Sequence, residues 1–232
     1  MKKPVFYIGG SSPALLHAEK ELRRLGYTVA ATPCPDVTHL LLNIPCREDF
    51  SDILAKLPKD VTIIGGNLQK ANNVIDLLQD EMYLAENAAI TAHCAVKLTL
   101  NKLSRCICHC PVLILGWGRI AQCLAHLARA MGANVTVAAR KEKDLAMAAA
   151  LGFDTVRLPC QDAKGYRIIW NTAPSPVLDE SQCDSSAVLM DLASVKGIAG
   201  EGVLWERGLP GREAPESSGI LITQTIHRIV KE

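Results

Sequence analysis

The sequence predicts an α/β protein made of two Rossmann/flavodoxin-like parallel-sheet domains joined by a long linker helix. Short β-rich runs alternate with helical patterns along the 232 residues. In addition, the segment LRRLGYTVAA at 22–31 is echoed by LARAMGANVTVAA at 127–139, and each follows a strand, a glycine-containing turn and a helix. We therefore expect two similar halves, each built as a nucleotide-fold unit.

The first half begins with a strand at Val5–Ile8 and a turn at Gly9–Ser12. Ser12 is suited to cap a helix and Pro13 to occupy its first position, so we expect a helix that Gly26 ends. The other elements expected here are strands at Tyr27–Ala31, Thr38–Asn43 and Val61–Ile64 and helices at Glu48–Leu57 and Leu68–Gln79.

A long helical pattern over Glu81–Lys102 has no strand directly before it, which predicts a linker helix within 81–104. The expected domains are residues 1–84 and 85–216. The later elements expected are strands at Val112–Leu115, Asn134–Ala139, Asp154–Leu158, Arg167–Trp170 and Ala187–Leu192, helices at Arg119–Met131 and Glu142–Leu151, a loop over RGLPGREAPESSG (207–219) and a last helix at 217–231.

Composition excludes several functional classes. Hydrophobic residues make up 49% of the chain and charged residues 21%, as in ordinary globular proteins. A net charge of +1 gives no overall attraction to nucleic acid, and no apolar stretch approaches the roughly 20 residues that a membrane helix needs. The apolar run at the start is short and broken, so it reads as a strand and not as a signal peptide. Nine cysteines without an export signal then predict free thiols in the cytoplasm.

The segment GWGRIA at 116–121 fits the dinucleotide-binding pattern G-x-G-x-x-[GA] and lies between an apolar strand and an apolar helix. Gly116 allows a tight turn, Gly118 lets the backbone approach a diphosphate, and Ala121 lets helix and strand pack closely. The alternative is a junction that uses glycine for geometry only. We assign cofactor binding here to Gly116, Trp117, Gly118, Arg119 and Ile120.

The second strand of this unit predicts which nicotinamide cofactor is bound. NAD-specific sites usually carry Asp or Glu about 20 residues after the glycines, where it binds the ribose 2′-hydroxyl. This chain has Arg140 and Lys141 there, and a guanidinium pairs with a 2′-phosphate. We therefore expect NADP(H), and the alternative is a solvated cluster of charges.

Three cysteines and a histidine in CICHC (106–110) raise the possibility of a metal site. Structural zinc sites favour two to four residues between paired cysteines, and no second pair completes a site here. On an extended chain, side chains two residues apart point the same way and are about 7 Å apart. We therefore predict no metal and place these cysteines on one face of a strand.

Ligands of open α/β sheets bind beyond the carboxyl ends of the strands, which selects three late segments. Asp191 is a candidate catalytic base, ribose ligand or structural cap, and Lys196 is a second candidate catalytic residue. The residues expected to contact the cofactor here are Asn171, Thr172, Ala173, Pro174, Ala193, Leu209 and Pro210. Lys196 and Arg212 are the charged groups best placed to meet an acidic substrate, although each could equally be a solvated loop charge, and Ser194 is a further substrate-binding candidate.

The remaining substrate-side candidates lie in the linker helix and at the first turn. If the linker helix lines the cleft between domains, His93 could act as an acid or base, and the alternative is a structural histidine. Ser11 and Ser12 could hold a substrate carboxylate, but a simple capped helix start is at least as well supported.

Several motifs together resemble those of the dipicolinate synthase A family, which comprises Rossmann-type relatives of D-2-hydroxyacid dehydrogenases and S-adenosylhomocysteine hydrolase. The motifs are VLILGWGRIAQCLAHLARAMGANVTVAAR, IIWNTAPSPVL, LMDLAS and RGLPGREAPESSG, with ENAAIT (86–91) matching the linker-helix region. The resemblance implies a flavodoxin-like first domain, an NADP(H)-binding second domain and a last helix that packs back onto the first. It also implies Asn87 and Thr91 as substrate-side residues. This chain departs from the family at Val195–Ile198 and at His93.

The resemblance implies an NADP(H)-dependent oxidation of a dihydrodipicolinate-type precursor during sporulation, carried out with a flavoprotein-like B-type partner. We therefore expect an enzyme that acts on a small cyclic dicarboxylate, and we also expect a homo-oligomer. Two alternatives stay open: an oxidoreductase for another small acid, and a non-catalytic NADP(H)-binding protein or redox sensor.

Overall fold

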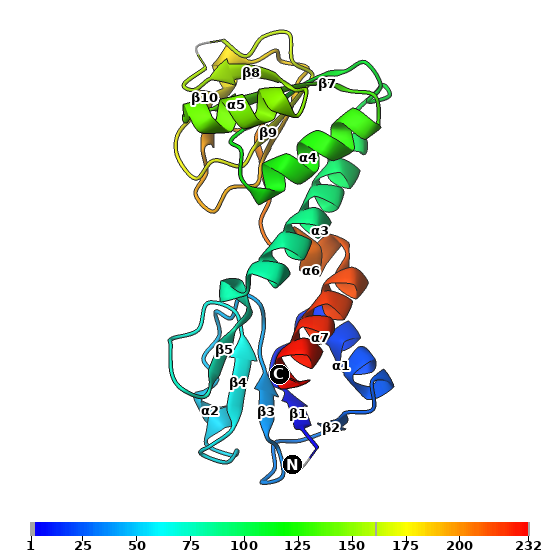
Figure 1. Cartoon of the computed structure of the whole chain (residues 1–232), viewed down its shortest axis with the longest axis vertical. Coiled ribbons are helices and arrows are strands. Elements are labelled where there is room, and N and C mark those ends of the chain that lie inside the picture. Colours follow the sequence, from blue (N-terminus) through cyan, green and yellow to red (C-terminus); the bar gives the residue numbers. More distant parts are fainter. Residues whose placement is uncertain (1–2, 161, 232) are drawn as a thin grey trace. The chain divides into compact units, whose positions relative to one another are not determined.

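The computed structural model of the chain describes residues 3–160 and 162–231 (Figure 1). The chain forms two compact units. The first contains the residues up to Asn87 and those from Pro210 onward, and the second contains Ala88–Leu209. Each unit is built around a parallel β-sheet, so the predicted fold class is confirmed.

The first unit has a five-stranded sheet in the order β2-β1-β3-β4-β5. Every neighbouring pair in it is parallel, which gives the flavodoxin-like order with a topological switch point between β1 and β3. The strands are β1 (Val5–Ile8), β2 (Thr28–Ala30), β3 (His39–Leu41), β4 (Thr62–Gly65) and β5 (Val74–Asp76).

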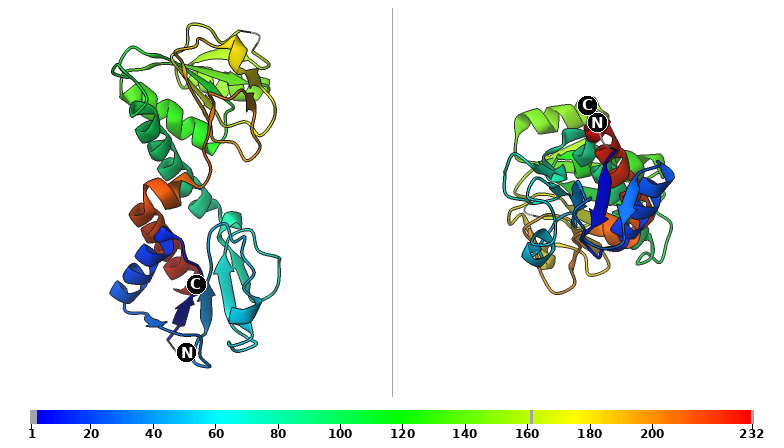
Figure 2. Two further views of the ribbon diagram at one scale, coloured as in Figure 1. Left: turned by 180° about the vertical axis from the view of Figure 1, so that it is seen from behind. Right: turned by 90° about the horizontal axis from the view of Figure 1, so that it is seen from below.

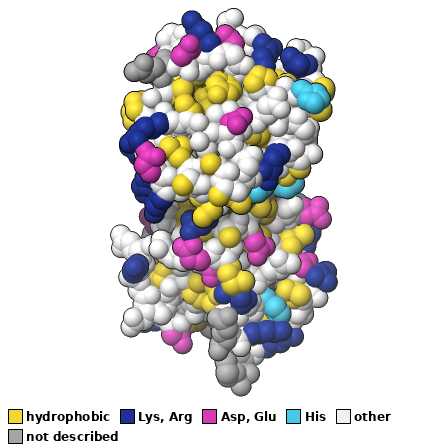
Figure 3. Space-filling model, turned by 45° about the horizontal axis from the view of Figure 1, so that its top comes forward, with side chains coloured by type: hydrophobic (Ala, Val, Ile, Leu, Met, Phe, Trp, Pro, Cys, Tyr) yellow, Lys and Arg dark blue, Asp and Glu magenta, His cyan; other side chains and the backbone are white. Residues whose placement is uncertain are grey.

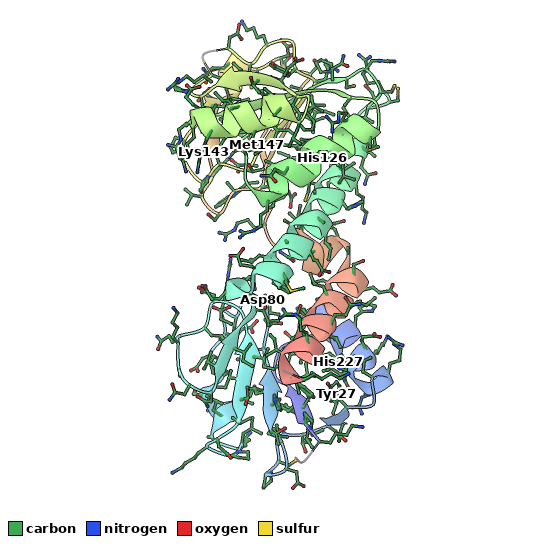
Figure 4. The ribbon with its side chains drawn as sticks, viewed as in Figure 1. Tyr27, Asp80, His126, Lys143, Met147 and His227 are labelled. Atoms are coloured by element: carbon green, nitrogen blue, oxygen red, sulfur yellow. The ribbon has the colours of Figure 1, made fainter. Side chains whose placement is uncertain are left out.

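Helices α1 (Pro13–Arg24) and α7 (Pro215–Lys231) pack against each other in this unit (Figures 1 and 2). The Thr223 hydroxyl of α7 donates to the Ala18 carbonyl at 3.2 Å. Farther along α7, the Tyr27 hydroxyl lies 2.8 Å from His227 Nδ1 (Figure 4). These contacts attach the last helix to the first unit, although more than a hundred residues of the other unit lie between them in sequence.

An ion pair adds to this attachment. Arg228 of α7 donates to the Asp80 carboxylate at 2.6 Å. Burial by itself would raise the pKa of Asp80, but the hydrogen bonds from Arg228 and from the Tyr83 amide hold that pKa below its usual value. Asp80 directly precedes helix α3 (Glu81–Leu100), which begins in the first unit and continues into the second.

The second unit has a six-stranded sheet in the order β13-β11-β9-β6-β7-β8, and all of its pairs are parallel. Numbered along the chain, this is the Rossmann order 3-2-1-4-5-6 read from the other edge. The strands are β6 (Pro111–Leu115), β7 (Asn134–Ala139), β8 (Asp154–Arg157), β9 (Ile168–Asn171), β11 (Val188–Asp191) and β13 (Leu204–Trp205). A separate two-stranded sheet pairs β10 (Leu178–Asp179) with β12 (Ile198–Ala199).

Helices α4 (Arg119–Ala130) and α5 (Glu142–Ala150) make the crossovers between the parallel strands β6, β7 and β8. The three residues 116–118 connect the carboxyl end of β6 to the amino end of α4. The buried Trp170 of β9 donates from its indole nitrogen to the Thr99 hydroxyl at 2.8 Å, which joins α3 to the sheet within this unit. Among the described residues, no helix is both long and apolar enough to cross a membrane.

Several sequence-based expectations are wrong. Residues 68–79 are not a helix, because they contain β5 and the short 3-10 helix Leu77–Gln79, and so a strand does precede the linker region. The Asp76 carboxylate accepts from the Leu78 amide at 2.9 Å and starts that short helix. The helix expected at 48–57 shrinks to α2 (Ser51–Leu54). The loop expected at 207–219 contains α6 (Leu209–Glu213) and the start of α7.

Candidate functional site

The carboxyl ends of β6 and β9 meet at the switch point of the six-stranded sheet, and the glycine turn lies there. Gly116 follows β6 with a φ of +104°, a conformation that favours glycine. A Cβ on Gly116 would also lie 2.6 Å from the Thr172 hydroxyl oxygen. That hydroxyl donates to the Leu115 carbonyl at 3.0 Å, so the turn and the end of β9 are held together. Both the backbone conformation and the close approach therefore require glycine here.

Gly118 differs from Gly116, because a Cβ added to it would meet no atom within 4 Å. It has an extended backbone and directly precedes α4, whose first N–H groups have no partner within the helix itself. Ala121 is fully buried against the sheet, as the third small position of the pattern requires. The open backbone over Gly118 and the amino end of α4 fit the diphosphate of a dinucleotide.

Trp117 lies between the two glycines, and its side chain is buried. The indole packs edge-on against Phe153 with the ring centroids 5.7 Å apart. Its Nε1 has no hydrogen-bond partner among the residues that the structure describes. The indole therefore acts as a packing group, and only the backbone of Trp117 contributes to the surface of the turn.

A basic edge lies at the carboxyl ends of β7 and β8. Arg140 and Lys141 directly follow β7 and are exposed, and within the described part of the chain Arg140 makes no ion pair. The neighbouring carboxylate, Glu142, is in contact with the guanidinium of Arg157. Arg157 pairs in register with Ala139, so it lies at the same edge. The Arg157–Glu142 pair leaves the charge of Arg140 without a neutralising carboxylate, and sequence analysis did not identify Arg157.

On the other side of the switch point, Asn171 ends β9 and is fully buried. Its side-chain oxygen accepts from the Ala173 amide at 2.9 Å, and its side-chain nitrogen donates to the Ala173 carbonyl at 3.1 Å. These bonds shape the turn that contains Thr172 and the exposed Pro174. The predicted segment 171–174 therefore lies beside the glycine turn, with Asn171 fixing its shape.

Asp191 ends β11 and is also fully buried. Its carboxylate accepts from the backbone amides of Ala193 at 3.0 Å, Gly197 at 2.6 Å and Ile198 at 2.9 Å. This set of bonds matches the structural-cap alternative and fixes the loop that carries the exposed Ser194. Lys196, in the same loop, donates from its ammonium group to the Gly200 carbonyl at 2.9 Å.

The candidates on α3 do not share one face. Asn87 and Thr91 are four residues apart and lie on the same side of the helix, whereas His93 is two residues beyond Thr91 and is rotated by about 200°. In agreement, Thr91 is buried and His93 is exposed. Of the candidates near α6, Leu209 and Pro210 are buried and Arg212 is exposed.

The turn at Gly9–Ser12 in the first unit is occupied by a side chain of the protein itself. Asn43 follows β3, is buried, and accepts from the Ser12 amide with its side-chain oxygen at 3.1 Å. Its side-chain nitrogen donates to Glu48 at 2.7 Å. Ser11 is exposed, and Ser12 makes no side-chain cap bond. Sequence analysis missed Asn43, since a polar residue at a strand end carries no distinctive local pattern.

A cavity of about 530 Å³ in the first unit was also missed. Its lining residues come from the loops that follow β3 and β4, among them Arg47, Glu48 and Phe50, and from β4 and β5, which contribute Ile63 and Val74. No pattern in the sequence pointed to it, because its lining comes from loops and strands that meet only in the fold.

The CICHC segment is not a strand face, so that interpretation is wrong. Residues 106–110 form turns before β6, and His109 adopts a left-handed φ of 59°. As a result the three cysteines differ: Cys106 is exposed, Cys108 is half-buried and Cys110 is buried. Within residues 3–160 and 162–231, no three His, Cys, Asp or Glu side chains are grouped as metal ligands.

On the face shown in Figure 3, basic and acidic side chains are interspersed.

The chain resembles known proteins both in its sequence and in its fold. No family model matches the sequence. The chain is 28% identical over 178 residues to the A polypeptide of dipicolinate synthase from Bacillus subtilis (strain 168). The match covers 71% of this chain and 60% of the length of that curated relative.

Solved structures show the same fold over nearly the whole chain. The dipicolinate synthase A polypeptide from Bacillus halodurans matches with a TM-score of 0.80 and 21% identity, covering 99% of this chain and 98% of the other. The corresponding polypeptide from Bacillus subtilis gives 0.80 and 20% identity, covering 100% and 96%. An L-alanine dehydrogenase gives 0.70 and 14% identity, covering 98% and 81%. The chain thus resembles the dipicolinate synthase A polypeptide in its sequence, and it has the Rossmann-type fold of that protein and of dehydrogenases.

Proposed function

We propose that this protein is an NADP(H)-dependent oxidoreductase of the dipicolinate synthase A type. It would transfer a hydride between nicotinamide and a small cyclic dicarboxylate such as dihydrodipicolinate. The observation that carries this proposal is the Gly116–Ala121 turn, which lies at the switch point of a sheet with the Rossmann strand order and leaves open space over Gly118. The substrate class rests on the sequence resemblance to the Bacillus subtilis protein.

Two groups of residues would hold the dinucleotide. The backbone from Gly116 to Ile120 and the amino end of α4 would bind the diphosphate, because free N–H groups and the helix dipole favour an anion there. Arg140 and Lys141 would pair with the 2′-phosphate at the end of β7. The contact between Arg157 and Glu142 supports this role, since it neutralises the carboxylate that would otherwise repel a phosphate.

The late loops would position the nicotinamide half. Residues Asn171–Pro174, Ala193, Leu209 and Pro210 would form its surroundings, and Asp191 would hold the loop in shape through its three amide hydrogen bonds. When bound, the cofactor supplies the hydride chemistry. Lys196 is the candidate for proton transfer, and the substrate-side contacts would come from Asn87, Thr91, Ser194 and Arg212.

We further propose that the enzyme acts in the cytoplasm as a homo-oligomer, together with a B-type flavoprotein partner, in dipicolinate formation during sporulation. The partner and the role in dipicolinate formation rest on the name of the curated relative and on the motifs shared with its family, and the cytoplasmic location rests on the many free cysteines. Assay of dihydrodipicolinate turnover with and without a B-type partner tests them. Turnover of another small acid would support the first alternative function. Cofactor binding without any turnover would support the non-catalytic one.

Calorimetric titration with NADPH and NADH tests the cofactor assignment. We expect the wild-type chain to bind NADPH more tightly, and Arg140→Gln to weaken NADPH binding by about 10- to 100-fold. The reason is that a hydrogen bond to a charged group contributes roughly 1.5–3 kcal/mol. NADH affinity should stay unchanged in this variant.

Lys143→Gln is the matched control, because Lys143 is exposed on α5 three residues beyond Arg140 (Figure 4). Absence of binding of either nucleotide to the wild-type chain would overturn the dinucleotide site. Tighter binding of NADH would overturn only the role of Arg140.

A further inference from the structure

An exposed tryptophan stands at the edge of the six-stranded sheet. Trp205 ends β13, and 46% of its surface is accessible to solvent. Its orientation is nevertheless set, because its indole nitrogen donates to the Ala193 carbonyl at 3.1 Å. Ala193 belongs to the loop that Asp191 holds in place. The indole is therefore a flat, apolar surface that is both oriented and open to solvent.

A positively charged side chain, that of Arg207, lies next to the indole. The guanidinium carbon of Arg207 lies 5.9 Å from the centroid of the Trp205 ring, within cation–π range. Arg207 is exposed, and among the described residues it makes no ion pair with a carboxylate. Its charge thus stays available to an anion that approaches the ring.

The place of this pair in the sheet links it to the proposed site. Trp205 pairs in register with Asp191, so the indole lies at the carboxyl edge of the sheet, where ligands of this fold bind. Strand β13 is two positions from β9, about 10 Å away at the usual strand spacing of about 4.8 Å. A side chain as long as tryptophan or arginine can therefore reach a molecule held next to the nicotinamide.

We propose that Trp205 and Arg207 form the substrate-recognition pair of this site, selecting a planar ring that carries carboxylates. The ring of the substrate would stack on the indole, and the guanidinium would pair with a carboxylate through two parallel N–H bonds. This inference rests on the proposed function and deepens it, since it names the side chains that would distinguish cyclic from open-chain diacids. Neither residue was selected by sequence analysis, because β13 has only two residues.

A purely structural role for Trp205 is the competing explanation, because its indole N–H also supports the 193 loop. Trp205→Phe keeps an aromatic face but loses the N–H, whereas Trp205→Ala loses both. Recognition by stacking predicts that Phe retains most of the affinity. Loop support alone predicts that the two variants behave alike.

The test uses the full chain saturated with NADP+, with dipicolinate as the ring diacid and glutarate as the open-chain diacid. Binding is measured by calorimetry and by protection of tryptophan fluorescence against acrylamide. Trp117 and Trp170 are buried, so the quenchable signal comes mainly from Trp205. We expect dipicolinate to bind at least 10-fold more tightly than glutarate and to protect the fluorescence.

Arg207→Gln and Trp205→Ala should each lower dipicolinate affinity about 10-fold or more, and in Arg207→Gln the NADPH affinity should stay within twofold of wild type. Arg105→Gln is the matched control, since Arg105 is exposed in the turns that precede β6, at the opposite edge of the sheet. If Trp205→Ala does not fold, Trp205→Phe and Arg207→Gln decide the question.

Normal dipicolinate binding by Arg207→Gln, or failure of the NADP+-loaded wild-type chain to bind dipicolinate, would overturn the pair and leave the cofactor site intact. Failure of the wild-type chain to bind NADPH at all would instead overturn the proposed function.

Discussion

The strand–turn–helix corners of the two units start from similar sequences and end in different surfaces. In the first, Ile8 is followed by Gly9–Ser12 and α1, and in the second, Leu115 is followed by Gly116–Gly118 and α4. A Cβ on Gly10 would lie 2.6 Å from the side-chain oxygen of Asn43, whereas a Cβ on Gly118 would meet nothing within 4 Å. One corner is filled by the protein, and the other is open.

The difference shows what a glycine-rich turn can and cannot indicate. In both corners a helix begins at the carboxyl edge of a parallel sheet, next to the switch point. In the first unit the Ser12 amide already donates to Asn43, which takes the place that an anion would need. Anion binding thus depends on whether a residue distant in sequence fills the corner, and not only on the spacing of the glycines.

The largest expected effect comes from filling the open corner. Gly118 has an extended backbone that accepts a branched residue, so Gly118→Val should fold normally. Its side chain would occupy the space proposed for the diphosphate, and NADPH affinity should fall about 100-fold, or about 2.7 kcal/mol. Calorimetry measures the affinity, and thermal unfolding checks the fold. Ala149→Val, on the exposed surface of α5, is the control, and unchanged NADPH affinity in Gly118→Val would contradict an open diphosphate site.

The reverse experiment adds a methyl group to the filled corner. Gly10→Ala should lower the free energy of unfolding by about 1–3 kcal/mol, because the new Cβ would press on Leu15 and Asn43. NADPH affinity should not change. Chemical denaturation of the single and double variants with Asn43→Ala gives the coupling. If Asn43 is what fills the corner, Gly10→Ala costs less stability once that side chain is removed, and equal costs would contradict the comparison.

Removing the Asn43 side chain tests whether it keeps an anion out of the first corner. Asn43→Ala removes the hydrogen bonds to Ser12 and Glu48, and the free energy of unfolding should fall by about 1–2 kcal/mol. The freed Ser12 amide should then accept an anion. Phosphate at a concentration near its Kd should stabilise the variant by about 0.4 kcal/mol relative to chloride at equal ionic strength. Wild type serves as the control, and equal stabilisation of both proteins would mean that Asn43 does not block the corner.

The smallest effects concern the ion pairs of the two units. Because the folded pKa of Asp80 lies below its unfolded value, the carboxylate contributes stability that is fully present above about pH 4. That contribution is lost as the pH falls through the folded pKa. Asp80→Asn should therefore lower stability by about 0.5–1.5 kcal/mol at pH 7 and by progressively less below pH 4. Denaturation at pH 3–7 measures this.

Arg157→Gln provides the matched comparison in the second unit, since its pair with Glu142 is largely exposed. Exposed ion pairs contribute little, so stability should change by less than about 0.5 kcal/mol at every pH tested. A pH dependence of Arg157→Gln as large as that of Asp80→Asn would contradict the difference in burial between the two pairs.

Sequence reasoning succeeded where one local feature decides the structure. The strands at Val5–Ile8 and Asn134–Ala139 were predicted with the bounds they have, because short runs rich in β-branched and aromatic residues lie between turns there. It failed at 68–79, where apolar residues suggested a helix but Val74 and Ile75 instead pair with β4. β-branched residues prefer strands when a neighbouring strand is available, and a single sequence does not show whether one is.

The residues of the candidate site also fall into two groups, those that local spacing predicts and those that it does not. The glycine turn and the basic residues Arg140 and Lys141 could be predicted, because their spacing from one strand defines their positions. His93 and Thr91 were expected on one side of the linker helix, but a spacing of two residues places their side chains on different sides of α3, which the predicted helix already implied. Arg157 and Trp205 were missed because each reaches the edge of the sheet through pairing with a strand distant in sequence.

By itself, the sequence determined the two parallel-sheet units, the glycine turn that opens α4 and the positive charge after β7. Each depends on residues within a few positions of one another, whose covalent connection sets their geometry. Only the tertiary structure decided that Asn43 fills the first corner, that Arg157 reaches the edge beside Arg140, and that Trp205 reaches the carboxyl edge beside β11. Those arrangements arise from packing and hydrogen bonding between segments that meet only after the sheets have formed.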